Sequence, residues 1–202
     1  MFLVHVVLAV LLIATVPMAL FCDPTMFWEL GPVETGDLIV LLVGSVLSSY
    51  WYITDDKRHS RFRNIWGIGG LLFFIATARE ASWGRIFIAD GIGPEGPIIP
   101  SMKSLWFGPF INVGIGIILL VLLVVMLRNR RLIVEFGRYV LSNKTALTYI
   151  VLFVVLLGVA DLVFDRNIIF ALNPWHQGFE EMIELAAYWS AVGFAVAARE
   201  KA

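Results

Sequence analysis

Apolar residues in this chain form long runs, separated by short polar segments. A bilayer core about 30 Å thick is crossed by a helix of about 20 predominantly apolar residues. The runs predict six transmembrane helices, at residues 2–21, 37–54, 65–88, 109–127, 145–164 and 176–198. The pattern therefore predicts an all-α, polytopic membrane protein with a single transmembrane domain.

The composition agrees with this pattern. Of the 202 residues, 59% are hydrophobic and only 15% are charged, which is far more apolar than a soluble domain of this size. The 15 basic and 16 acidic residues nearly cancel, so the overall charge indicates no nucleic-acid partner. The partner that the composition does indicate is the lipid bilayer.

The basic residues predict which side of the membrane each connection occupies. Lysine and arginine gather in three segments, at residues 57–63, 128–144 and 199–201. The other connections are at residues 22–36, 89–108 and 165–175, and their only lysine and arginine residues are Lys103 and Arg166. Because basic connections stay in the cytoplasm, we expect both termini to be cytoplasmic and the protein to be in the bacterial inner membrane.

Two of the connections have a distinctive composition. Residues 89–108 are rich in glycine and proline, which disfavours a helix, and they include several apolar side chains. We interpret this outer loop as a lid that lies back on the bundle. Residues 130–141, on the predicted inner side, have the pattern of an amphipathic helix lying along the membrane surface.

The last predicted span carries ionisable groups where hydrocarbon is expected. An Asn-Pro pair at residues 173–174 suits the N-cap and first position of a helix. His176, Glu180 and Glu184 then follow at steps of four, which places them on one helix face. Glu181 lies about 100° around the axis from that face. We expect these groups to face the protein interior, because lipid solvates them poorly.

Two other predicted spans bring ionisable groups to the same level. The span at 145–164 ends near Asp161, and the outer third of the span at 65–88 contains Arg79, Glu80, Trp83 and Arg85. Each charge at the centre of a span costs about 2.5–3.5 kcal/mol, so these groups require partners or a polar cavity. The candidate ligand-binding residues are Arg79, Glu80, Trp83, Arg85, Asp161, Glu180, Glu181 and Glu184.

The leading interpretation is a site that binds a cation, a proton or a small polar ligand, used for transport, sensing or within a membrane complex. Its acidic wall is formed by Glu80, Asp161, Glu180 and Glu184, with Arg79 and Arg85 as counter-charges. Twelve of the 16 acidic residues are on the predicted outer half, which concentrates cations there.

Two alternatives remain open. The first is a membrane-embedded enzyme acting on a lipid-like substrate, with His176 and Glu180 as general acid and base. Carboxylates with one imidazole also suit a divalent metal such as manganese, iron or magnesium, for which the candidate ligands are Glu80, His176, Glu180 and Glu184. The second alternative is a purely structural subunit in which the acids and arginines hold helices together.

Small residues recur along the last predicted span. Alanines at positions 187, 191, 195 and 198 follow at spacings of four and three, which allows another helix to approach closely. We interpret this seam as internal packing against the spans at 65–88 or 145–164. A homo-oligomer or a larger membrane complex is the alternative use of the same seam.

The segment EASWGRIF, at residues 80–87, resembles a group of uncharacterised bacterial inner-membrane proteins. These proteins carry Glu-x-Ser-Trp-Gly near the outer end of a span and a pair of acids in a later helix, here Glu180 and Glu181. The group usually has an extra residue between Gly84 and Arg85. The resemblance covers about 10 residues and implies no activity, but it favours Glu80, Trp83, Gly84 and Arg85 as members of a site.

Overall fold

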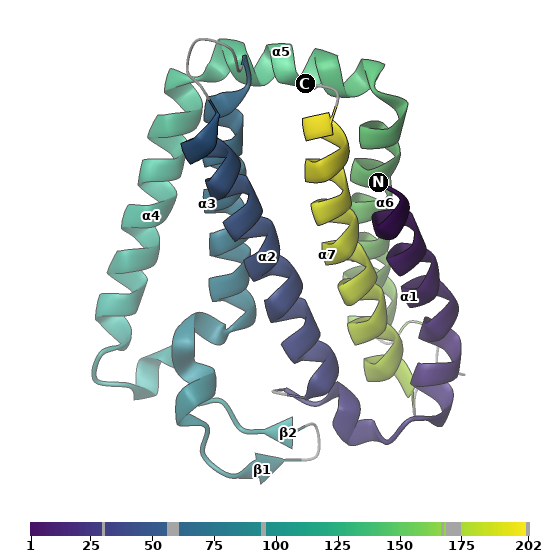
Figure 1. Cartoon of the computed structure of the whole chain (residues 1–202). Coiled ribbons are helices and arrows are strands. Elements are labelled where there is room, and N and C mark those ends of the chain that lie inside the picture. Colours follow the sequence, from purple (N-terminus) through teal and green to yellow (C-terminus); the bar gives the residue numbers. More distant parts are fainter. Residues whose placement is uncertain (30, 56–60, 94–95, 167, 169–174, 201–202) are drawn as a thin grey trace.

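The computed structural model describes residues 1–29, 31–55, 61–93, 96–166, 168 and 175–200 (Figure 1). Six helices form an upright bundle within these residues: α1 (Phe2–Phe21), α2 (Pro32–Thr54), α3 (Arg63–Glu80), α4 (Gly108–Arg128), α6 (Lys144–Val159) and α7 (His176–Glu200). A further helix, α5 (Arg130–Ser142), crosses one end of the bundle, and the small hairpin of β1 (Ile92–Gly93) and β2 (Gly96–Pro97) lies at the other. We call these the α5 end and the hairpin end.

The chain is an all-α, multi-pass membrane protein. Five helical segments of the described chain are long and apolar enough to cross a membrane: Phe2–Phe21, Pro24–Thr54, Gly108–Arg128, Lys144–Asp165 and His176–Glu200. Each overlaps a predicted span, although the second begins well before residue 37. The predicted span at 65–88 corresponds to α3, which is shorter and is not among these five.

The second helix begins earlier than the predicted span. The apolar run suggested that the second span begins at residue 37, whereas α2 begins at Pro32. Proline suits the first position of a helix, and Glu34 in the first turn interacts favourably with the partial positive charge of the helix N-terminus. Glu34 and Asp37 therefore lie within a helix.

The prediction of one continuous helix over residues 65–88 was wrong. Helix α3 ends at Glu80, and the chain then turns through three residues with positive φ: Ser82 (46°), Trp83 (56°) and Gly84 (83°). Glycine adopts this conformation without the steric cost that a side chain brings. The guanidinium of Arg85 holds the turn, donating to the carbonyl of Ser82 at 3.0 Å and to that of Pro100 at 2.8 Å.

The predicted outer lid contains regular structure as well as irregular chain. Strands β1 and β2 pair antiparallel, with Ile92 opposite Pro97 and Gly93 opposite Gly96. The backbone groups of Asp90 and Gly91 also bond to those of Ile98, at 2.9 and 3.2 Å. Figure 1 shows the hairpin extending across the end of the bundle near the start of α2.

The segment predicted to be an amphipathic helix is α5, which lies across the helix ends (Figure 1). Its aromatic side chains Phe136 and Tyr139 pack inward, where Phe136 contacts the rings of Phe62, Trp66 and Phe194. Its arginines lie on the opposite face, lining a shallow groove with Val134 and Glu135. The predicted helix is confirmed, and its packing ties α3 to α7.

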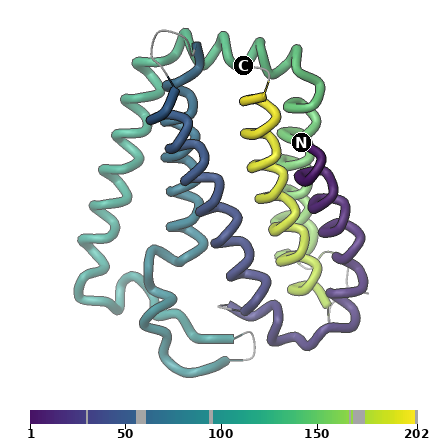
Figure 2. Tube along the Cα trace, viewed as in Figure 1, coloured from purple at the N-terminus to yellow at the C-terminus, as the bar shows by residue number. Residues whose placement is uncertain are grey.

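Helix α7 is the central helix of the bundle, whereas α4 lies at its edge. In the most apolar stretch of each helix, 61% of the α7 residues are buried against 6% of the α4 residues. Helix α7 contacts α1, α2 and α6, and α3 runs antiparallel to α2 (Figure 2). The alanine seam is directed inward, since Ala187, Ala195 and Ala198 are buried.

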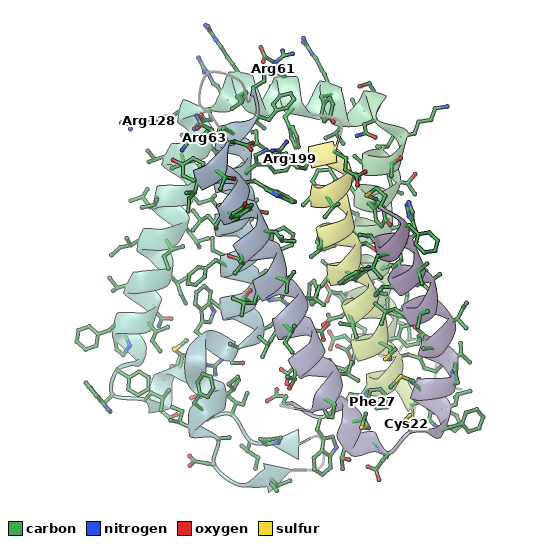
Figure 3. All side chains as sticks on the ribbon, in the orientation of Figure 1. Cys22, Phe27, Arg61, Arg63, Arg128 and Arg199 are labelled. Carbon is green, nitrogen blue, oxygen red and sulfur yellow. The ribbon has the colours of Figure 1, made fainter. Side chains whose placement is uncertain are left out.

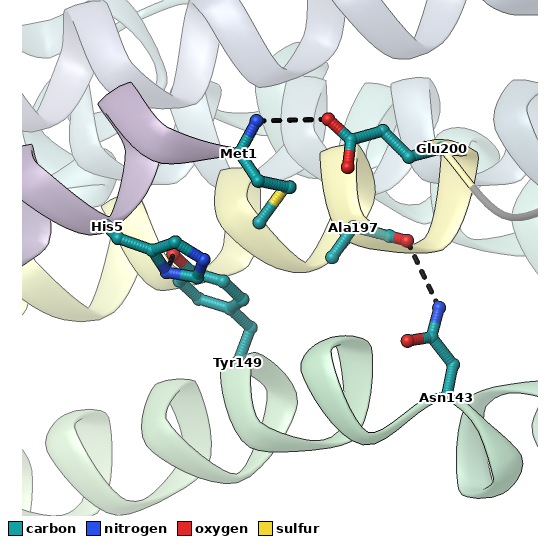
Figure 4. A network of polar contacts seen from close by, with 6 residues as sticks. All are labelled: Met1, His5, Asn143, Tyr149, Ala197 and Glu200. Carbon is teal, nitrogen blue, oxygen red and sulfur yellow. Dashed lines mark hydrogen bonds and ion pairs between the residues drawn. The ribbon is translucent and has the colours of Figure 1, made fainter.

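Polar contacts close the α5 end around the two chain termini. The amino group of Met1 lies 3.0 Å from the carboxylate of Glu200, and Asn143 donates to the carbonyl of Ala197 at 3.1 Å (Figure 4). The guanidinium of Arg199 lies 2.6 Å from the carboxylate of Asp55, which caps the end of α2. Met1 and the last turn of α7 are thus held at one end of the bundle.

Several arginines lie at the α5 end of the bundle. Figure 3 shows Arg61, Arg63, Arg128 and Arg199 at the α5 end, opposite Cys22 and Phe27 at the hairpin end. Residues 57, 58 and 201, which also entered the prediction of a cytoplasmic face, lie outside the described residues. So do residues 173 and 174, which were predicted to begin the last helix.

Candidate functional site

Six carboxyl groups from three helices lie close together near the hairpin end. We call this group the carboxyl cluster: Glu34 and Asp37 of α2, Glu80 of α3, and Glu180, Glu181 and Glu184 of α7. Each lies close enough to at least two of the others for electrostatic repulsion. Like charges at short range are unfavourable in a medium of low dielectric constant. Such an arrangement favours the binding of positive charge.

Helix geometry explains how the residues converge. Glu34 and Asp37 are three residues apart on α2, and Glu180 and Glu184 are four apart on α7. Both spacings bring side chains to one face of a helix. Helices α2 and α7 pack against each other, while Glu80 reaches the same level from the end of α3. The cluster is therefore built from tertiary contacts between three helices.

Asp37 is the most unusual member of the cluster. Its side chain is 0% exposed, and neither carboxylate oxygen has a hydrogen-bond partner among the described residues. Buried polar groups are normally hydrogen-bonded, because an unpaired buried charge is strongly unfavourable. Glu34, Glu80, Glu181 and Glu184 all lie within electrostatic range of Asp37 and increase this cost.

Glu80 has the best-defined environment in the cluster. The hydroxyl of Tyr188 donates to its Oε1 atom at 2.8 Å, which joins α7 to α3. The guanidinium of Arg79 lies 3.7 Å from the same oxygen, but the Arg79 side chain is 65% exposed. An exposed ion pair at this distance contributes little stability. Arg79 therefore offsets only part of the negative charge.

A polar cavity of about 550 Å³ lies beside the cluster at the hairpin end. Its polar lining residues are Glu29, Asp165, His176, Gln177, Glu180 and Glu181. The hairpin forms the opposite wall through Gly93 and residues 96–99, as the predicted lid over this region would. Glu180 and Glu181 belong to both the cavity wall and the carboxyl cluster.

The structure brings most of the predicted site residues together, with two differences. Asp161 is exposed and lies on a π-helical segment (Ala160–Asp165) that continues α6, although it remains within electrostatic range of Glu184. Arg85 was predicted to be a counter-charge, whereas its guanidinium donates to backbone carbonyls in and beyond the turn after α3. Trp83 lies in that same turn.

The predicted metal ligands do not form a compact metal site. Among the residues that the structure describes, no three His, Cys, Asp or Glu side chains are grouped closely enough to hold a metal ion. His176 lines the polar cavity, while Glu80 and Glu184 lie deeper, toward Asp37 and Tyr188. A metal centre on these four residues stays a prediction.

Sequence reasoning missed Glu34 and Asp37, the two members contributed by α2. Both were assigned to the connection or the edge of a span, because they interrupt the apolar run. Their spacing of three residues, directly followed by a long apolar stretch, was the available signal. Only the packing of α2 on α7 shows that Asp37 is buried.

Comparisons with models of protein families, with curated proteins and with solved structures each gave no match. The resemblance at residues 80–87 therefore stays a prediction. In this structure the Ser82-Trp83-Gly84 segment forms a left-handed turn, which gives the glycine a conformational role.

Proposed function

We propose that this protein is a bacterial inner-membrane protein that binds a cation, a proton or a small polar ligand at the carboxyl cluster. The cluster lies near the outer face, and the protein acts in transport, in sensing or as a subunit of a larger membrane complex. The support comes from the position and environment of the acidic residues. Membership in the uncharacterised Glu-x-Ser-Trp-Gly group is part of the same proposal and rests on residues 80–84.

The proposed topology has six spans with both termini in the cytoplasm. Helix α3 has 18 residues, which is within the range of transmembrane helices, and it packs antiparallel to α2. The ion pair between Met1 and Glu200 brings both termini to the α5 end, as an even number of spans requires. The arginines at that end favour a cytoplasmic location.

The observation that carries the proposed function is the environment of Asp37. An ionised carboxylate with no partner in the protein interior is costly, and a purely structural network has no reason to retain one. Binding of a proton or a cation removes that cost. The other five carboxyl groups increase the attraction for positive charge.

The proposed function is tested by measuring cation and proton binding to purified protein in lipid nanodiscs. Sodium, potassium, magnesium and manganese are added in turn to weakly buffered protein, and heat and released protons are recorded. We expect saturable binding or proton release that is lost in Asp37→Asn. Asp23→Asn is the matched control, since Asp23 is an exposed aspartate at the same end of the bundle. Equal responses in both variants contradict the proposal.

The polar cavity favours a second candidate function, a membrane-embedded enzyme. Its volume of about 550 Å³ is in the range of small-molecule sites, and His176 and Glu180 both line it. Elemental analysis of the wild type and of a Glu180→Gln, Glu184→Gln variant tests this alternative. A stoichiometric metal that the variant loses, together with turnover of a substrate, favours the enzyme over the cation-binding function.

A further inference from the structure

A second cavity lies next to the carboxyl cluster, toward the centre of the bundle. It has a volume of about 220 Å³, and its exposed lining is almost entirely apolar. Helices α2, α3, α5, α6 and α7 all contribute to it. Its aromatic walls are Trp66, Phe73, Phe136, Phe153, Tyr188 and Phe194.

Three acids of the carboxyl cluster lie at the hairpin end of this cavity. Leu41 of α2 lines the cavity, and Asp37 is one helical turn closer to the hairpin end. In α3, Ala76 lines the cavity, and Glu80 is one helical turn closer to the hairpin end. Helices α2 and α3 run in opposite directions (Figure 2), so Asp37 in the first half of α2 and Glu80 at the end of α3 lie toward the same end of the bundle.

Helix α7 repeats this relationship and connects the two environments. Tyr188 lines the apolar cavity, and Glu184 lies one turn closer to the hairpin end. The ring of Tyr188 faces the cavity while its hydroxyl bonds to Glu80 at 2.8 Å. One side chain therefore marks the boundary between the apolar cavity and the acidic cluster.

We propose that the cavity and the cluster together form a site for an amphipathic organic cation, with an apolar tail and a positively charged head. This inference rests on the proposed function, because it names the ligand class of the same acidic site. The tail lies among the aromatic side chains, where burial of apolar surface is favourable. The head lies against Glu80 and Glu184, with Asp37 behind them. Aromatic rings such as Tyr188 also attract cationic heads through their π-faces.

Charge complementarity selects this occupant over a neutral lipid chain. Asp37, Glu80 and Glu184 each lie one helical turn from a residue that lines the cavity, and Arg79, whose side chain is 65% exposed, lies beside Glu80. A neutral head group gains at most a hydrogen bond from these carboxylates, and an anionic head group is repelled by them. A small inorganic cation gains from the carboxylates but makes no use of the adjacent apolar surface.

The test uses radiolabelled octyltrimethylammonium and the full-length protein in phosphatidylcholine nanodiscs, with binding to empty nanodiscs subtracted. Tetramethylammonium, 1-octanol and sodium are the competitors. We expect saturable binding of octyltrimethylammonium, and competition by tetramethylammonium that is at least about 100-fold weaker, because each buried methylene adds to affinity. This comparison needs only the wild-type protein.

Variants separate the head from the tail. Ala191→Phe fills the cavity. We expect it to weaken the binding of octyltrimethylammonium at least about tenfold while leaving sodium binding intact. Val113→Phe is the control, since Val113 is exposed on α4. Glu184→Gln is expected to weaken the binding of every cation tested. Ala191→Leu, which adds less volume, replaces Ala191→Phe if the latter does not fold.

The outcomes distinguish this inference from the proposed function. Binding of sodium or tetramethylammonium with no gain from a longer chain overturns the inference and leaves the proposed function intact. Absence of binding by every cation overturns both. Equal binding of 1-octanol and octyltrimethylammonium, unaffected by Glu184→Gln, identifies the cavity as a site for a neutral acyl chain and also overturns the inference.

Discussion

Tyr188 of α7 and Glu80 of α3 are joined by a hydrogen bond of 2.8 Å, although 108 residues separate them in the sequence. The bond lies where the apolar cavity meets the carboxyl cluster. It connects α3 to the central helix at the hairpin end, just before the chain turns at Ser82. The position of Glu80 therefore depends on α7 as well as on its own helix.

Tyr188→Phe removes this bond while keeping the aromatic ring. We expect the free energy of unfolding in micelles to fall by about 1.5–3 kcal/mol, the usual contribution of a hydrogen bond to a charged group. Cation affinity is expected to fall as well, because Glu80 loses its fixed position. Tyr50→Phe, an exposed tyrosine on α2, is the control. Equal stability of the two variants contradicts the role assigned to Tyr188.

Asp37 within α2 and Asp55 at the C-cap of the same helix are expected to respond in opposite ways to neutralisation. Asp37→Asn removes a charge that has no hydrogen-bond partner among the described residues, so it does not lower stability. Asp55→Asn disrupts the 2.6 Å ion pair with Arg199, and is expected to lower the free energy of unfolding by about 1–3 kcal/mol. Denaturant titration of both variants in the same detergent provides the comparison.

The functional result for the two variants is expected to be the reverse of the stability result. Asp37→Asn loses cation or proton binding, while Asp55→Asn retains it in the folded fraction. A residue that is unfavourable for stability yet required for binding is typical of functional sites. If Asp37→Asn instead destabilises the protein as much as Asp55→Asn does, Asp37 has a structural role.

Gly193 tests the close packing of α7 on α6. A Cβ atom at this position would lie 2.5 Å from the ring of Tyr149, and that ring is fixed by a 2.6 Å hydrogen bond to His5 (Figure 4). We expect Gly193→Ala to cost about 1–3 kcal/mol through overpacking. Gly158→Ala, on α6 in open space, is the control and is expected to gain up to about 1 kcal/mol. Thermal unfolding of both variants decides between these outcomes.

Gly84 tests whether the Ser-Trp-Gly segment requires glycine for its conformation. Its φ is +83°, and no neighbouring atom lies within 4 Å of the position that a Cβ atom would occupy, so alanine introduces backbone strain without a steric contact. We expect Gly84→Ala to lower stability by about 1–2 kcal/mol. Gly114→Ala in α4, also in open space, is expected to be neutral or stabilising. Similar melting temperatures for the two variants contradict the conformational role.

The sequence pattern was sufficient for the long apolar helices. Helix α1 has the predicted bounds of residues 2–21, because nearly all of its residues are apolar and hydrophobicity is sufficient to identify it. The pattern failed at α2, where Glu34 and Asp37 end the apolar run but not the helix. Their surroundings are formed by α7 and α3. The sequence near Glu34 and Asp37 does not indicate which helices pack against them.

The candidate site was predictable in part for the same reason. Glu180 and Glu184 were recognised because a helical spacing within one segment places them together. Asp37 was missed because its importance arises from complete burial against other helices. The role of Arg85 also depends on a distant partner, the carbonyl of Pro100, which no spacing rule indicates.

The most direct measurement is difference infrared spectroscopy of the carboxyl bands of the purified protein before and after a cation is added. Spectra are recorded for the wild type, Asp37→Asn and the control Asp23→Asn. We expect a cation-dependent change in the wild type that persists in Asp23→Asn and is absent in Asp37→Asn. Identical changes in all three proteins, or none in the wild type, would contradict a cation site at Asp37.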